Sequence, residues 1–273
     1  MGVVLVAPPR TIPILNYHSV SETPGPEIAS FTVRPTELAS HLDQVMSSGL
    51  VPLTVSALVG LLDSGGVPPQ GAVVITFDDG FEDNLAVAAP MLASRGLPAT
   101  VFVTTGYLPG CPVAGLIPAP GPMIPYDRLT ELETFGIEVG SHAHSHRQLD
   151  VLPKDEAGTE IRLGKELLER ALGHPVASFA YPHGYAGRSL QREVRRSGFS
   201  SACGVRNAFS HVDDNKWLLA RLTVLDSTTH AQVAEWLDGA GAPIASRHEH
   251  LRTKAWRMTR RLRASKPSSA VRQ

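Results

Sequence analysis

Three predicted strands of this chain are each followed directly by side chains that could do chemistry. The apolar run "VVITF" leads into Asp78 and Asp79, and "IEVGS" leads into His142, with His144 and His146 close behind. A third run, "SFA", leads into "YPHG". Because the carboxyl ends of parallel strands share one face of an α/β barrel, we expect these groups to converge although they are far apart in sequence.

Each group also has a simpler explanation when it is taken alone. Asp-Asp-Gly is common in turns and at helix N-caps, and histidines four residues apart could lie on a helix surface. Adjacent carboxylates after five apolar residues repel each other, however, unless a cation or hydrogen-bond donors stabilise them. One carboxylate with two imidazoles matches the protein ligands of an open catalytic zinc site. A metal held by Asp79, His142 and His146 would acidify a bound water and polarise a substrate carbonyl, which leaves Asp78 free to act as general base.

Helix-like and strand-like segments alternate along the chain, and this alternation indicates a parallel α/β sheet. At 273 residues, a closed or nearly closed barrel is favoured over an open doubly wound sheet. The Pro/Gly-rich stretch 106–125 has no periodicity and is predicted to be a long loop. We predict helices over 34–49, 83–96, 127–136, 155–173 and 189–198, and strands over 12–17, 72–77, 99–105, 137–142, 177–182, 200–205 and 219–225.

"TFDDG" and "SHAHSH" resemble the first two motifs of the polysaccharide deacetylases, which are carbohydrate esterase family 4 and carry the NodB homology domain. The resemblance extends from about residue 14 to 224 and implies a distorted (β/α)7 barrel in a single domain. It also implies that Asp78 is the base and that Asp79, His142 and His146 bind a divalent metal, with Zn²⁺ expected and Co²⁺ or Ni²⁺ as alternatives. His144 is then expected to support the site from behind or to be exposed.

The third motif of that family usually has arginine and tyrosine on either side of a proline, and this chain departs from it with Tyr181, Pro182 and His183. Backbone N–H groups near these three residues are candidates for binding the substrate oxyanion. The arginine that orients the base in the family is missing here. Arg221 could replace it, and a structural salt bridge at a strand end is an equal alternative.

The family's late Leu-x-His motif, which carries the general acid, is not found after Arg221. His230 in "STTH" lacks the leucine and is expected at the start of a helix. The chain resembles the circularly permuted poly-N-acetylglucosamine deacetylases, in which the acid lies on the first strand after a tyrosine. His18 in "ILNYHSV" matches that position, and histidine suits the protonation of an amine.

These residues together predict a metal-dependent hydrolase that removes N-acetyl groups from amino sugars of a polysaccharide or glycoconjugate. A sugar O-acetyl esterase or a metal-dependent amidase acting on a non-sugar amide would use the same machinery. A non-catalytic glycan-binding relic is disfavoured, because the metal ligands and the base are all present.

Charge is distributed unevenly along the chain. Residues 246–273 hold nine Lys/Arg and one acid, while the formal charge of the whole chain is −1, so the rest is acidic and a nucleic-acid-binding core is not expected. We predict a catalytic domain over 1–245 and a basic amphipathic tail over 246–273, partly disordered. That tail would either contact a membrane or a glycan-assembly partner, or pack on the barrel.

The first residues of the chain and its two cysteines indicate the cellular compartment in which we expect the protein. "MGVVLVAPPR" has too short an apolar run for a signal peptide, and two distant cysteines do not form a disulfide framework. The sequence therefore predicts a cytoplasmic protein, or one that is peripheral to the membrane.

Overall fold

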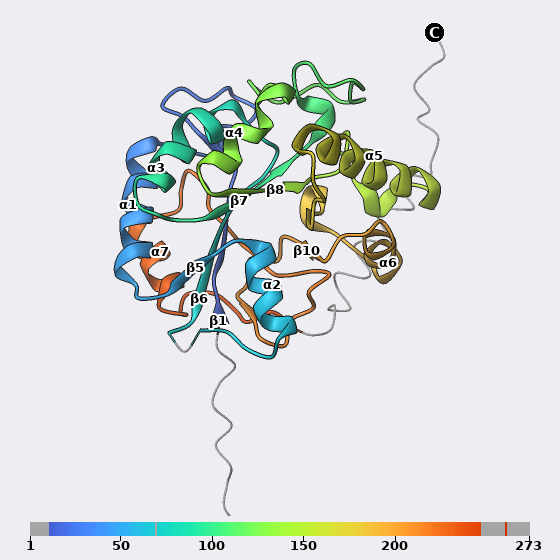
Figure 1. The fold of residues 1–273 in the computed structure, drawn as a ribbon. Helices are drawn as coiled ribbons and strands as arrows, with labels where there is room; N and C mark the ends of the chain where they lie inside the picture. The colour runs from blue at the N-terminus through green and yellow to red at the C-terminus, as the bar shows by residue number, and fades with distance from the viewer. Residues whose placement is uncertain (1–10, 69, 247–259, 261–273) are drawn as a thin grey trace, which may run out of the picture.

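The computed structural model describes residues 11–68, 70–246 and 260 (Figure 1). The predictions for the first ten residues and for nearly all of the basic tail therefore lie outside the described residues. Within the tail, Arg260 forms a salt bridge with Asp150 and stacks on the ring of Tyr185, so at this residue the chain lies against the barrel. Among the residues described, none of the helices combines the length and apolar character needed to cross a bilayer.

One mainly parallel sheet organises the chain, in the order β10-β9-β8-β7-β6-β2-β12, with β5 paired to the first half of β6. Small two-stranded pairs, β1 (Thr11–Ile12) with β11 (Ser210–His211) and β3 (Ser19–Val20) with β4 (Thr32–Val33), flank it. The strands of the main sheet are β2 (Ile14–Tyr17), β5 (Val51–Leu53), β6 (Ala72–Phe77), β7 (Ala99–Val103), β8 (Ile137–Ser141), β9 (Ser178–Ala180), β10 (Ser201–Cys203) and β12 (Leu222–Thr223).

The segment before β12 closes the sheet into a distorted barrel. Leu219 forms a parallel bridge with Cys203 of β10, and three residues later Leu222 pairs with Leu15 of β2. One stretch of chain therefore connects the two ends of the sheet. The architecture is the predicted α/β barrel, and Arg221 lies in the segment that closes it.

Helices cover the outside of the sheet, as the alternating pattern predicts (Figure 1). They are α1 (Pro35–Ser47), α2 (Val55–Asp63), α3 (Ala89–Ala93), α4 (Leu129–Thr134), α5 (Lys154–Leu172), α6 (Arg188–Arg196) and α7 (His230–Leu237). In α1, Pro35 occupies the first turn, where its missing N–H has no intrahelical partner to lose, and Leu38, Leu42 and Val45 form the buried stripe. α2 and β5 are additional to the elements that the sequence pattern predicts.

The predicted helix over 83–96 differs from the structure in one respect. α-Helical residues Glu82 and Asp83 are followed by a π-helical turn over Asn84–Ala88, and the α-helix continues from Ala89. Pro90 has no N–H to donate to the carbonyl four residues earlier, so a regular α-helical ladder cannot form there. The boundaries of the other predicted elements agree with the structure to within a few residues.

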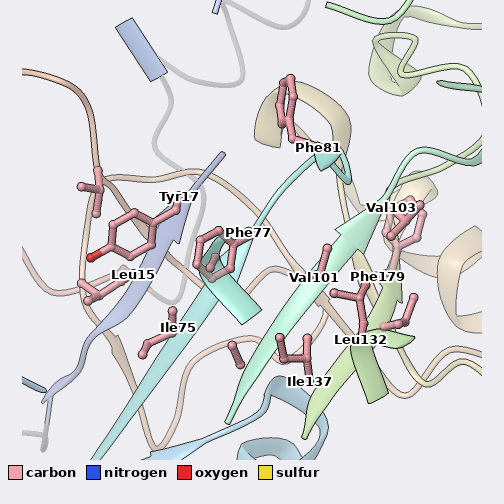
Figure 2. Close-up of a cluster of buried hydrophobic side chains, with 14 of the residues drawn as sticks. Leu15, Tyr17, Ile75, Phe77, Phe81, Val101, Val103, Leu132, Ile137 and Phe179 are labelled. Carbon is pink, nitrogen blue, oxygen red and sulfur yellow. The ribbon is translucent and has the colours of Figure 1, made fainter. Parts of the chain in front are cut away.

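The core lies between the sheet and its helices. Every residue of β6 is buried, as expected for a parallel strand covered on both faces. Figure 2 shows Leu15 and Tyr17 of β2 beside Ile75 and Phe77 of β6, with Val101 and Val103 of β7 on the next strand. This apolar packing fixes the strands whose carboxyl ends carry the polar side chains.

Candidate active site and metal centre

Asp79, His142 and His146 come together at the carboxyl ends of β6 and β8, where a ligand atom of each lies within 4.8 Å of the others. Asp79 Oδ1 lies 3.2 Å from His146 Nε2 and 3.6 Å from His142 Nε2. That oxygen is buried and accepts no hydrogen bond from any described residue. A buried carboxylate oxygen facing two imidazole nitrogens fits a cation of the Zn²⁺ type.

The ligand atom of His142 is fixed by its other ring nitrogen. Nδ1 donates to the carbonyl of Ala180 at 2.8 Å, so the lone pair of Nε2 faces Asp79. A second hydrogen bond of this kind is usual for metal-binding histidines. Burial lowers the pKa of His142 to about 3, which keeps the imidazole neutral, the form that binds metal.

The backbone is folded tightly around the three candidate ligands. Asp79 and His146 have φ values of 75° and 52°, in the left-handed region that non-glycine residues rarely adopt, and Ala143 has 62°. The N–H of Thr104 donates to the carbonyl of Asp79, and the N–H of Gly106 donates to that of His144. The loop after β7 therefore holds both ligand-bearing turns in conformations that cost of order 1 kcal/mol each.

Asp78 is held by a buried arginine. Nη1 and Nη2 of Arg221 each donate to one carboxylate oxygen at 2.7 Å, and both side chains are almost fully buried. Burial opposes ionisation of Asp78, but the charge of Arg221 and its hydrogen bonds hold the pKa of the Asp78 carboxyl well below the usual range. The geometry matches the predicted base-orienting contact, although the residues lie 143 positions apart. A structural salt bridge would make the same contact, so the role itself stays a prediction.

The pKa of Asp79 is shifted in the opposite direction from that of Asp78. Burial raises the pKa of its carboxyl to about 6, the positive charge of His18 opposes this, and the charge of Asp78 adds to it. The two neighbouring carboxylates therefore differ strongly: Asp78 forms a salt bridge with an arginine, whereas Asp79 forms none with a lysine or arginine of the described residues. This division matches a base and a metal ligand.

A family model described as polysaccharide deacetylase matches residues 65–202, a span that includes the aspartate pair and the three histidines. The chain belongs to the polysaccharide deacetylase family. A Bacillus subtilis protein named putative polysaccharide deacetylase YxkH is 24% identical over 216 residues, which are 79% of this chain and 72% of that protein. The poly-β-1,6-N-acetyl-D-glucosamine N-deacetylase of Staphylococcus aureus is 22% identical over 242 residues, 81% of each.

Solved structures share the fold of this polysaccharide deacetylase. The Streptococcus pyogenes deacetylase PplD, in complex with acetate, superposes with a TM-score of 0.72 at 23% identity, covering 83% of this chain and 97% of that one. IcaB from Ammonifex degensii superposes with a TM-score of 0.71 at 23% identity, covering 84% and 97%. At this level of identity, the likeness establishes the distorted barrel.

His18 follows β2, whose last residue pairs in register with the residue before Asp78. The amide of Asn84 donates to the carbonyl of His18 at 2.7 Å, which fixes the backbone there. Burial lowers the pKa of His18, and the charges of Asp79 and Asp78 raise it again, so the ring lies within electrostatic reach of both aspartates. The fold thus places His18 at the site, whereas His230 packs on α1 with Glu37 and His41.

The third motif of this chain only partly matches the prediction. The hydroxyl of Tyr181 donates to the carbonyl of Trp217, and its N–H donates to that of Cys203. Pro182 has no N–H. Tyr181 and Pro182 therefore do not supply the predicted oxyanion donors, because the N–H of Tyr181 is already hydrogen-bonded and Pro182 has none. Both residues are also buried. His183 is exposed and its ring centroid lies 4.8 Å from that of His146, and its contact with the substrate stays a prediction.

His144 is buried, so of its two expected positions the exposed one is wrong, and its support of the metal site stays a prediction. Its Nε2 donates to the carbonyl of Ala114 and its Nδ1 accepts from the hydroxyl of Thr105, so both ring nitrogens are engaged with the loop after β7. Tyr107 on the same loop was missed, and its ring centroid lies 5.8 Å from that of His146. It follows the carboxyl end of β7, and the strand-end rule applied to that strand could have found it.

Proposed function

We propose that this polysaccharide deacetylase is a metal-dependent hydrolase that removes N-acetyl groups from amino sugars of a glycan. One observation carries the proposal: an orphaned Asp79 oxygen faces the Nε2 atoms of His142 and His146, beside an aspartate that Arg221 keeps ionised. The similarity to the Staphylococcus aureus poly-β-1,6-N-acetyl-D-glucosamine N-deacetylase supports an N-acetylglucosamine polymer as the substrate.

Asp79, His142 and His146 would hold the cation, and Zn²⁺ fits two imidazoles and one carboxylate. When it is bound, the cation supplies a Lewis acid that polarises the acetyl carbonyl and acidifies a water molecule. Asp78 accepts the proton from the attacking water, because Arg221 keeps its carboxyl ionised and fixes its direction.

Departure of the sugar amine needs a proton donor, because a free amide anion is a very poor leaving group. His18 lies at the end of the neighbouring strand and would give its proton to the amine nitrogen. The backbone N–H of His183 remains the candidate donor to the oxyanion from the third motif.

Acetate release from β-1,6-linked N-acetylglucosamine oligomers by the Zn²⁺-loaded protein tests this proposal. We expect Asp78→Asn to lower kcat by about 10²–10⁴-fold while the bound zinc is retained, because the base is not a ligand. His146→Ala should lose both the zinc of this centre and the activity. Equal acetate release by Asp78→Asn and the parent protein would contradict the mechanism.

The substrate class is tested by comparing three acetylated compounds at equal concentration. An N-acetylglucosamine oligomer should have a higher kcat/KM than an O-acetylated sugar or an N-acetylated peptide. A preference for the O-acetylated sugar would identify an esterase, and a preference for the peptide would identify an amidase acting on non-sugar substrates. Either result would overturn the proposed substrate while leaving the metal centre intact.

A further inference from the structure

A second group of metal-binding side chains lies where α1 packs against α7, outside the site described above. Glu37 and His41 are one turn apart on α1, and His230 is the first residue of α7. One ligand atom of each residue lies within 4.8 Å of those of the other two. The two helices lie side by side in Figure 1, although they come from opposite ends of the chain.

His41 has a buried nitrogen without a partner. The side chain is 1% exposed and lies on the stripe of α1 that faces the core. Its Nδ1 lies 3.2 Å from the hydroxyl of Tyr17, whereas its Nε2 is buried and has no hydrogen-bond partner among the described residues. Leaving such an atom unpaired is unfavourable, because it has lost its hydrogen bonds to water without gaining others. With the proton on Nδ1 and donated to Tyr17, the lone pair of Nε2 is available, which is the arrangement that metal-bound histidines adopt.

The other two ligands form the outer side of the cluster. Nε2 of His230 contacts the carboxylate of Glu37, and both side chains are partly exposed, so an ion can enter from solvent. The position of His230 is fixed by its backbone, because the amide of Gln44 donates to its carbonyl at 3.1 Å and Thr229 caps the helix. Burial lowers the pKa of His41 to about 4, so the imidazole is neutral at pH 7, as a ligand must be.

We propose that Glu37, His41 and His230 form a second site for a divalent cation of the Zn²⁺ class, which ties α1 to α7. Two imidazoles and a carboxylate favour Zn²⁺ over Mg²⁺ or Ca²⁺, which prefer oxygen ligands. Three protein ligands leave one position for water. The site has no role in the proposed reaction and does not depend on it. The alternative is an ion pair between a protonated His230 and Glu37, with no metal.

The number of zinc ions bound per chain, measured after equilibrium dialysis against Zn²⁺, distinguishes the metal site from the ion pair. The parent chain should bind two equivalents, and His230→Ala and Glu37→Gln should each bind one. His174→Ala is the matched control, because its exposed imidazole lies 2.7 Å from Glu133 but belongs to no three-ligand cluster among the described residues, and this variant should still bind two. If His230→Ala and Glu37→Gln keep the zinc content of the parent, the site does not exist.

The number of zinc ions bound also shows which of the two clusters, this one or the proposed active site, does not bind metal if one of them is wrong. His146→Ala should retain one equivalent, held by the second site, and the double variant with His230→Ala should hold none. If the active-site cluster binds no zinc, the parent holds one equivalent and His230→Ala holds none, so the second site is still supported.

Thermal unfolding gives an independent readout. In the His146→Ala background, Zn²⁺ at a hundredfold excess over Kd should raise the unfolding midpoint by roughly 5 °C. The shift should vanish when His230→Ala is added, because a single imidazole and a carboxylate remain. An equal shift in both proteins would overturn the proposal.

Discussion

At the scale of single residues, the two adjacent aspartates differ because of what faces each. Asp78 shares a bidentate, buried contact with Arg221, whereas Asp79 faces imidazole nitrogens and keeps a buried oxygen unpaired. The pKa of Asp78 is therefore lowered and that of Asp79 is raised to about 6. Adjacent residues of one type thus acquire the two properties that a metal-assisted hydrolysis needs.

Replacing Asp78 should also destabilise the fold. In the metal-free protein at pH 7, Asp78→Asn should lower the free energy of unfolding by about 3 kcal/mol, because it leaves the buried charge of Arg221 unpaired. A lowered pKa in the folded state means that this stabilisation is complete above about pH 4 and is lost as the pH falls further. Urea unfolding at several pH values should therefore show a difference from the parent that is constant from pH 7 to 5 and shrinks below pH 4.

The matched control for that experiment is an exposed ion pair. Asp43 bonds to Arg95 at 2.7 Å with its side chain 64% exposed, so Asp43→Asn should change the stability by less than about 0.5 kcal/mol. A similarly small effect of Asp78→Asn at pH 7, or one that grows as the pH falls, would show that the buried pair does not stabilise the protein.

His18 can be tested by the nature of the leaving group. His18→Gln should lower the rate of N-acetylglucosamine deacetylation by about 10²–10⁴-fold, because the amine must be protonated as it leaves. Hydrolysis of 4-nitrophenyl acetate should fall less than about tenfold, because the phenolate leaves without a proton. His230→Gln should leave both rates unchanged. An equal loss for both substrates would mean that His18 only supports the structure.

At the scale of elements, helix α5 positions the loop that carries the histidines. Gly164 faces that loop so closely that a Cβ added there would lie 2.8 Å from the backbone carbon and oxygen of Ala143, between the ligand His142 and His144. The small residue therefore permits the helix to support the left-handed turn at Ala143. Close approach of backbones is a common reason for glycine inside a helix.

Gly164→Ala should therefore weaken zinc binding at the active site and lower the free energy of unfolding by about 1–3 kcal/mol. Zinc titration and urea unfolding measure the two effects. Gly60→Ala in α2 is the matched control, since its Cβ would meet nothing within 4 Å, and it should be more stable than the parent by about 0.5–1 kcal/mol. If both variants are stabilised equally and bind zinc normally, α5 does not constrain the loop.

At the scale of the whole molecule, the segment that closes the barrel, residues 219–222, also carries the arginine that contacts Asp78. Arg221 lies between the bridge to β10 and the pairing of β12 with β2, and its Nε donates to the carbonyl of Gly204 while Nη1 reaches Asn16 and Asp78. Closure of the barrel therefore places the guanidinium of Arg221 against the carboxylate of Asp78, the proposed base.

The barrel should remain folded when the cation is removed, because its strands are held by apolar packing and backbone hydrogen bonds (Figure 2). We expect chelation to abolish acetate release, to lower the midpoint of thermal unfolding and to leave the far-UV circular dichroism unchanged at 25 °C. Added Zn²⁺ should restore activity. Loss of secondary structure on chelation would show instead that the metal is required for folding.

The sequence alone determined the features that depend on local pattern. Apolar runs and helical spacing located most strands and helices, because backbone periodicity imposes them on neighbouring residues. The short spacing of the aspartate pair and of His142 and His146 indicated their chemistry. Local pattern could not show the π-helical turn before Pro90, nor that the N–H and hydroxyl of Tyr181 are already bonded.

Only the tertiary structure decided the long-range contacts. The sequence suggested Arg221 as the replacement for the missing arginine, and closure of the barrel brings it into contact with Asp78, 143 positions away. The same closure places His230 on α1 beside Glu37 and His41, rather than at the active site. Such contacts follow from which strands become neighbours and how the helices pack on them, and no local periodicity encodes that information.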